Sequence, residues 1–529
     1  MKYQRIPDIQ SAAGSTPGRL ALPVVFLLLS LVIPFVFSAG PLRLSVYRLV
    51  LIFFFFPCVI LWVRGRAGPV RLADLSLLFF CAWAALSFAV VHGVGKSIEG
   101  GGILFLETMG AYLMARCFVR DAESFRRMVR LLFIIIAAML PFAVWESVTG
   151  QNIMREIFDK IYPAYHDVFK LPRWGLRRVQ GPFEHPILFG VFCSGILALV
   201  HVVLGYQTSW IRRMSQTLAV ATTAFLSLSS GPLISMGVQI ALLGWDDTLK
   251  AIKSRWKIFA GLALFAVLLV NLFSNRSIPR LLISFFAFNT SSAWNRLRIW
   301  EYGSASVLNN PLWGIGLNEW ERPEFMVKSV DMLWLVPAMR HGLPGGLALH
   351  LAFFAVFLPV LFKKGLDARQ KRFRAGFLIS MAGFYISGWT VYFWNATYVL
   401  FIFLLGSGVW LLEAKPSSGA HRDVRPVRPV GQMPRGSLYR RNPIKNRHRD
   451  AQSHSGTGRA SAESPEIHTG AGAPAAEEKQ TGAHAQTRVK DPASAKSHGG
   501  GKMRTKRKPP AGAARLRGRL NQARPGRRS

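Results

Sequence analysis

The chain has 529 residues, of which 51% are hydrophobic, and it carries 65 Lys and Arg against 27 Asp and Glu, a formal net charge of +38. A soluble domain rarely combines so apolar and aromatic a composition with so large a positive charge. The two properties are segregated, because the segment 415–529 holds 26 basic and 7 acidic residues and almost no large apolar side chains. We therefore expect an apolar membrane domain followed by a separate basic tail.

Apolar runs of roughly 15 to 22 residues recur along the chain, close to the length of about 20 that a spanning helix needs. They lie at 20–39, 44–63, 72–91, 98–119, 129–149, 183–205, 217–230, 232–245, 257–273, 332–361, 375–391 and 395–413. The first run is long enough to span a membrane rather than to be removed as a signal peptide. The seventh and eighth are short enough to be one bent helix, and Gly342, Pro344 and Gly345 are expected to break the tenth near its start. The predicted fold class is all-α: a polytopic membrane protein with about twelve transmembrane helices.

The loops between the runs differ in charge. Those that would face the cytoplasm, if the N-terminus lies inside, are rich in Lys and Arg, whereas the short outer loops hold only Arg43 and Lys96. This asymmetry places the N-terminal segment 1–19 and the tail 414–529 in the cytoplasm, with the membrane domain at 20–413. Two longer outer loops, about 150–182 and 274–331, each carry six basic residues, which suits an anionic ligand.

The four cysteines predict packing rather than chemistry. Cys58, Cys81, Cys117 and Cys193 lie in or beside apolar runs without close pairing or zinc-ligand spacing. We expect no metal ion and no cofactor.

The stretch "RVQGPFEHPILFG", residues 178–190, begins the sixth run with a Gly181–Pro182 turn and a proline, Pro186, suited to the first turn of a helix. Its helix N-terminus would face the outer side beside Arg177 and Arg178. Free N–H groups and the positive end of the helix dipole favour a phosphate or diphosphate group there. The alternative is that the arginines extend to lipid headgroups.

The second stretch, "NRLRIWEYGSASVLNNPLWGIGLNEW", covers residues 295–320. Its apolar spacing predicts an amphipathic helix lying at the outer interface and ended by Pro311. Arg296 and Trp300 are four residues apart and share one face, whereas Arg298 points elsewhere.

The third stretch, "SVDMLWLVPAMRHGLPGG", places Asp331 at the start of the tenth run and Arg340 about nine residues deeper. Ionisable residues in a spanning segment indicate a functional site by default, although a structural ion pair is an alternative. Arg48 in the second run and Glu99 and Glu107 in the fourth are candidates for pairing within the membrane, unless they only stabilise the bundle.

Together, these stretches resemble the O-antigen ligase and polymerase superfamily over roughly residues 20–413. The resemblance includes "LSLSSGP" at 226–232, where that family has a small-residue turn on the outer face, and "AMRHGLPG", which resembles its Gly-Leu-x-Gly helix. The matching residues of the first two stretches are Arg178, Gly181, Phe183, Pro186, Arg296, Trp300, Pro311, Gly314 and Gly316.

This resemblance implies a metal-independent membrane glycosyltransferase that uses glycans on undecaprenyl diphosphate at the outer face of the bacterial inner membrane. Arg178 and Arg296 would hold the diphosphate, since arginine stays charged and binds it in a bidentate way. Further candidates for diphosphate contact are Arg177, Arg298 and Arg340.

Asp331 is the first candidate base, because it stands where ligases of the family usually have a His-Asn pair. That departure favours an exopolysaccharide or O-antigen polymerase over a ligase. Glu184 and His185 are further catalytic candidates, on the acceptor side of the site, unless they only cap the helix.

Two alternatives remain open for the function, and two for the basic tail. One is a ligase that moves finished glycan to a lipid or protein acceptor, and another is a flippase of lipid-linked saccharides, although the ionisable residues gather at one face. The basic tail is predicted to be disordered and either binds the anionic leaflet or is dispensable. Expected partners are lipid-linked glycan, membrane lipids and other polysaccharide-assembly membrane proteins; nucleic acid is not expected.

Overall fold

The structure, a computed structural model, describes residues 19–39, 42–166, 168, 170–252, 254–273 and 290–415. All of these belong to one compact unit, residues 1–428. The predicted N-terminal segment up to residue 18, part of the second outer loop and the basic tail from 416 onward lie outside the described residues.

The first apolar run is not a spanning helix, which corrects the sequence prediction for 20–39. It forms a nine-residue helix, α1 (Leu22–Ser30), followed by an antiparallel hairpin of β1 (Val36–Ala39) and β2 (Leu42–Ser45), in which Phe37 pairs with Leu44. Pro34 disfavours helical backbone at the residue before it, and the β-branched and aromatic side chains around it suit a strand.

Among the described residues, six helices are long and apolar enough to cross a membrane. They are α2 (Val46–Val63), α3 (Leu72–His92), α7 (Ala122–Thr149), the run of α9 (Pro186–Ser194), α10 (Leu197–Leu199) and η3 (Val200–Leu204), α16 (Val336–Phe362), and the run of α18 (Asn395–Ser407) and α19 (Trp410–Glu413). The protein is therefore a mostly helical, membrane-embedded protein. The count of twelve spans is not confirmed.

The remaining predicted spans are also helical, and most of them are shorter, broken or more polar. They are α11 (Trp210–Phe225), α12 (Ser230–Thr248), α13 (Arg255–Phe273) and α17 (Ala368–Gly388). The fourth span is a continuous helical run of α4 (Val94–Lys96), η1 (Ser97–Gly101), α5 (Gly102–Phe105), η2 (Leu106–Gly110) and α6 (Ala111–Phe118). Its two π-helical turns end at Gly101 and Gly110, where the absence of a side chain eases local rewinding.

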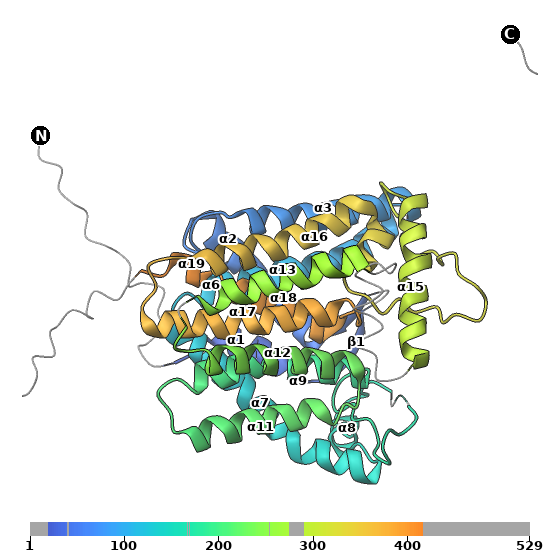
Figure 1. Ribbon diagram of the computed structural model, residues 1–529. Coiled ribbons are helices and arrows are strands. Elements are labelled where there is room, and N and C mark those ends of the chain that lie inside the picture. Colours follow the sequence, from blue (N-terminus) through green and yellow to red (C-terminus); the bar gives the residue numbers. More distant parts are fainter. Residues whose placement is uncertain are drawn as a thin grey trace, which may run out of the picture. The chain divides into compact units, whose positions relative to one another are not determined.

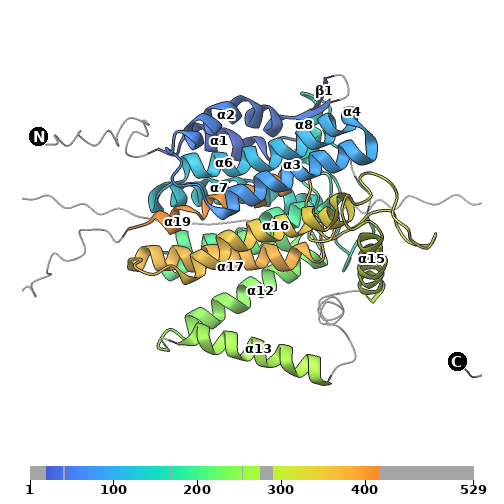
Figure 2. The same ribbon diagram turned by 90° about the horizontal axis from the view of Figure 1, so that it is seen from above.

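The helices pack lengthwise, with α3 along α16, α6 along α18 and α12 along α17. One helix of the predicted outer loop, α15 (Thr290–Asn309), runs across one end of these helices, on the side of the β-hairpin and of α8 (Ile153–Asp159) (Figures 1 and 2). This confirms the helix expected in the second stretch. Both basic outer segments therefore reach the same end of the unit, which we call the α15 end.

Several buried charged side chains at the opposite end, which carries α19, are paired with each other. Arg116 contacts Asp74 at 2.5 Å, and Asp246 accepts from both Arg255 and Arg372 at 2.8 Å. Of the predicted partners of Arg48, Glu107 pairs with it, with Nε of Arg48 2.8 Å from the carboxylate, whereas Glu99 pairs with Lys96 at 3.1 Å. Buried arginine normally needs such a carboxylate, which makes two arginines at the α15 end, Arg178 and Arg296, unusual.

Candidate functional site

Two arginines from distant parts of the chain meet at one serine-rich turn. The turn between α11 and α12 passes through Leu228, whose φ is +44°, and brings two consecutive serines to the α15 end. Arg178 donates from Nη2 to Oγ of Ser229 at 2.8 Å, and Arg296 donates from Nη2 to Oγ of Ser230 at 2.8 Å. These four residues are called the arginine–serine cluster below.

A buried carboxylate on α7 holds the backbone of the segment that carries Arg178. Glu146 of α7 accepts hydrogen bonds from the backbone N–H groups of Gln180 and Gly181 at 2.8 and 3.0 Å. Gly181 has a φ of +55°, which a side chain would strain, and Val179 donates to the carbonyl of Leu226 beside the serine turn. The turn predicted at Gly181 is thereby held rigidly against α7 and the serine turn.

Both arginines keep a guanidinium nitrogen without a partner. Nε of Arg178 and Nη1 of Arg296 are buried and make no hydrogen bond among the described residues. Arg296 lies on the inner face of α15 with only 5% of its surface exposed. A buried, unsatisfied cationic donor is costly unless a ligand supplies the missing acceptor.

Electrostatics at the cluster point the same way. Burial, together with the charge of Arg173, lowers the pKa of Arg178 to about 10. Burial also lowers the pKa of Arg296, with Asp331 opposing and Arg173 adding to the shift. Each lowered pKa means that the ligand-free fold destabilises the charged guanidinium relative to the unfolded chain. A bound anion would stabilise that charge and raise the pKa again.

Arg173 is a third cation of this site, which the sequence analysis did not single out. It donates from Nη1 to the carbonyl of Leu228 at 2.7 Å, and so reaches the same turn as Arg178 and Arg296. The only sequence signal for it is its position in the basic loop 150–182, where Lys170 and Arg177 are equally plausible. A tertiary contact, rather than spacing, distinguishes it.

Glu184 and His185 lie beside the cluster but are occupied by structural contacts. His185 caps α9, with Nδ1 accepting the N–H of Ile187 at 3.1 Å, and burial lowers its pKa to about 4, so the ring is neutral. Glu184 accepts from the side-chain amide of Asn395 at 2.6 Å, and burial raises its pKa. Asn395 in turn accepts from Arg48, which links Glu184 to the buried Arg48–Glu107 pair.

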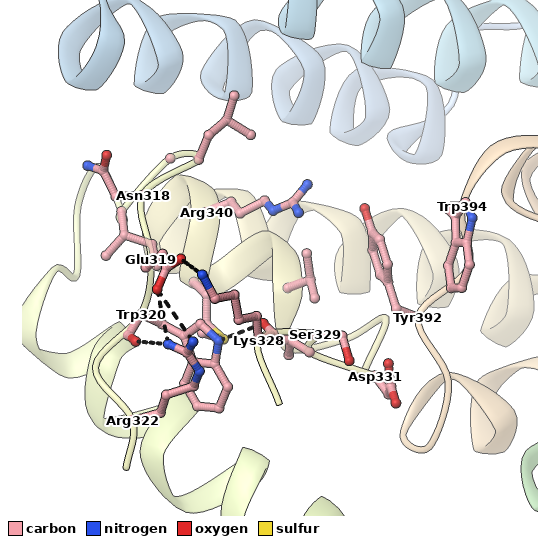
Figure 3. A pocket seen from close by; sticks show the side chains of 16 residues that line it. Asn318, Glu319, Trp320, Arg322, Lys328, Ser329, Asp331, Arg340, Tyr392 and Trp394 are labelled. Atoms are coloured by element: carbon pink, nitrogen blue, oxygen red, sulfur yellow. Dashed lines mark hydrogen bonds and ion pairs between the residues drawn. The ribbon is translucent and has the colours of Figure 1, made fainter. Parts of the chain in front are cut away.

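Asp331 stands between the cluster and a cavity of about 330 Å³. Figure 3 shows its carboxylate at one side of this cavity, with Tyr392 and Trp394 nearby and Arg340 farther along the wall. Burial raises the pKa of Asp331, whereas the charge of Arg296 opposes the rise. Asp331 thus lines a cavity with room for a saccharide unit, whereas Glu184 and His185 line neither this cavity nor two other cavities found among the described residues.

The other predicted arginines are placed differently. Arg177 is tied to α7 through a 2.9 Å bond from its N–H to the carbonyl of Ser147. Arg298 is exposed, with its guanidinium 4.9 Å from the centre of the Phe325 ring, so it does not join Arg296. Arg340 lines the cavity of Asp331 and is absent from the contacts of the arginine–serine cluster.

Within the described ranges, no group of three or more His, Cys, Asp or Glu side chains is placed to hold a metal ion. Comparisons with known proteins do not identify the family, since no family model and no curated protein matches the chain.

Proposed function

We propose that the protein is a membrane glycosyltransferase that polymerises undecaprenyl-diphosphate-linked oligosaccharide repeat units at the outer face of the bacterial inner membrane. The observation that supports this proposal most is the arginine–serine cluster with its two unpartnered guanidinium nitrogens. Diphosphate supplies acceptor oxygens for these nitrogens and compensates the buried positive charge. The basic loops at the other end of the unit would face the cytoplasm, as would both termini.

The proposed reaction is a displacement at the anomeric carbon of the donor sugar. An acceptor hydroxyl oxygen forms the new bond to that carbon, and the bond from the carbon to the diphosphate oxygen breaks. Undecaprenyl diphosphate leaves with the bonding electrons. Arg178, Arg296 and Arg173 stabilise the negative charge that grows on the leaving oxygen, which is where a preorganised cationic site lowers the barrier most.

The proton of the acceptor hydroxyl passes to a carboxylate, and we assign this role to Asp331. It lies within the electrostatic influence of Arg296 and also lines the cavity beside the cluster. Its raised pKa makes it a better base than an ordinary aspartate. Glu184 and His185 act as positioning residues in this scheme, because the first holds Asn395 and the second caps α9.

The test uses the purified full chain in proteoliposomes with a lipid-linked repeat unit as donor and acceptor. Arg178→Gln and Arg296→Gln should each lower the rate of polymer formation by about 10² to 10³, the range for removing one preorganised donor to a developing oxyanion. Arg43→Gln is the matched control, because Arg43 is an exposed arginine on β2 at the same end. Polymer of wild-type length from both cluster variants, at normal expression, contradicts the proposal.

The same variants in cells separate the related alternatives. Loss of a polymerase leaves single repeats on the lipid carrier. Long lipid-linked polymer that is not transferred onward would instead indicate a ligase. Repeat units that accumulate on the inner leaflet would indicate a flippase.

A further inference from the structure

We propose that the cavity lined by Arg340 is the acceptor subsite, and that it selects a sugar carrying a carboxylate or another acidic group. This inference rests on the proposed function and adds a substrate class to it. Arg340 lines two neighbouring cavities, of about 330 and 210 Å³, which share Leu317, Val336, Tyr392 and Trp394 as well. The residues of the arginine–serine cluster line neither.

The charge of Arg340 is uncompensated by protein groups. Among the described residues its guanidinium forms no ion pair or hydrogen bond, and its recorded contact is the ring of Tyr392, 5.7 Å from the ring centre. Glu319 in the same wall cannot neutralise it, because it already pairs with Lys328 at 2.5 Å and with Arg322 at 3.4 Å (Figure 3). Asp331 lines the same cavity but forms no ion pair with Arg340 among the described residues, so the cavity presents a cation that contacts no carboxylate, which favours an anionic ligand group.

Aromatic rings beside Arg340 suit the apolar faces of a sugar ring. Tyr392 and Trp394 stand side by side with their ring centres 6.1 Å apart and their planes inclined by only 24° (Figure 3). Trp394 also contacts His185, with ring centres 6.3 Å apart, so this platform extends from the acceptor cavity toward the start of α9. A saccharide stacked there would have a hydroxyl near Asp331 and an acidic substituent near Arg340.

The backbone holds Arg340 in place through a break in α16. Gly342 has a φ of +74°, and the break leaves the carbonyls of Met339 and Arg340 free to accept from the N–H groups of Ile315 and Gly316 at 2.8 and 2.9 Å. These two hydrogen bonds attach the glycine-rich segment that follows α15 to α16, next to Arg340. This fixed backbone is what a selective binding residue needs.

The test measures binding by saturation-transfer difference NMR with the full chain in lipid nanodiscs. The probes are D-glucuronate and its neutral isostere D-glucuronamide, which differ in charge but hardly in shape. Wild-type protein should bind glucuronate at least five-fold more tightly. Arg340→Gln should remove that preference while leaving glucuronamide binding unchanged, and Arg340→Lys should retain part of it. Trp394→Ala should weaken both probes together.

Two controls make the result specific. Arg43→Gln, on the exposed hairpin, and Arg296→Gln, in the arginine–serine cluster, should both keep the preference for glucuronate. Equal binding of the two probes by the wild type overturns the inference, as does a preference that survives Arg340→Gln or disappears with Arg296→Gln. Size-exclusion chromatography checks that each variant stays folded. Because binding needs no turnover, the inference can fail while the polymerase assay succeeds, and the reverse.

Discussion

Replacing Arg178 by methionine should stabilise the ligand-free protein and weaken its stabilisation by pyrophosphate. The pKa of this guanidinium falls from its ordinary value to about 10 on folding, chiefly because of burial. At about 1.4 kcal/mol per pKa unit, this corresponds to about 3 kcal/mol of unfavourable charge burial. Part of the side chain still reaches solvent, so about 2 kcal/mol is a better figure.

The direction of the pKa shift determines that the buried charge destabilises the folded protein at neutral pH. Below about pH 10 the group is charged in both the folded and the unfolded chain, so the cost is fully present at neutral pH and is relieved only as the pH rises through that value. Methionine removes this cost and loses the bond to Ser229, worth about 1 kcal/mol. The hydroxyl of Ser229 still donates to the carbonyl of Ser227 at 2.8 Å, so no donor is orphaned. The net gain is about 1 kcal/mol.

The assay is thermal unfolding of the detergent-solubilised full chain, with and without pyrophosphate. At a concentration of 100 times its dissociation constant, pyrophosphate should add about 2.7 kcal/mol to the wild type. Losing one charge-assisted contact, worth about 1.5 to 3 kcal/mol, should leave only about 0.3 to 1.3 kcal/mol in Arg178→Met at the same concentration. Arg43→Met should behave as the wild type. A lower unfolding midpoint in Arg178→Met, with the pyrophosphate effect intact, would refute the reasoning, because Arg178 would then be a structural residue.

Three further predictions concern the base, the buried pair and the packing of the turn. Asp331→Asn should lower kcat by about 10² to 10⁴ and remove the acid limb of the pH–rate profile. In the wild type, activity falls as the pH is lowered and Asp331 gains its proton. This fall should occur at a higher pH than for an ordinary aspartate, because the pKa of Asp331 is raised. Arg48→Met should destabilise the protein by about 3 to 5 kcal/mol, measured by thermal unfolding, because it leaves the Glu107 carboxylate buried and unpaired, and adding Glu107→Gln should recover much of the loss. Gly190→Ala should lower both thermal stability and polymer formation, because a Cβ there would lie 2.3 Å from Oγ of Ser227 and displace the serine turn. Normal values for both would show that the turn can shift without loss of function.

The sequence by itself determined the elements whose signals are local. The apolar runs at 44–63 and 72–91 became α2 and α3 almost residue for residue, and the amphipathic spacing around Arg296 became α15. The break of the tenth run at Gly342 was equally readable, because glycine adopts a positive φ without strain. Hydropathy gave a wrong prediction for the run 20–39, which is apolar enough for a membrane helix. This run forms the short helix α1 and, after Pro34, the first strand of the hairpin.

Only the tertiary structure decided which charges form the site. Arg178 and Ser229 are 51 residues apart, and Arg296 and Ser230 are 66 apart, so no periodicity connects them. Helical spacing already predicted that Arg296 and Arg298 point to different faces, and Arg298 is indeed exposed while Arg296 is buried. Spacing did not predict which face is buried or what Arg296 contacts there. Sequence spacing supplies positively charged side chains at one end of the protein. Whether each is neutralised by a carboxylate or left for a ligand depends on contacts that form only when distant segments pack together.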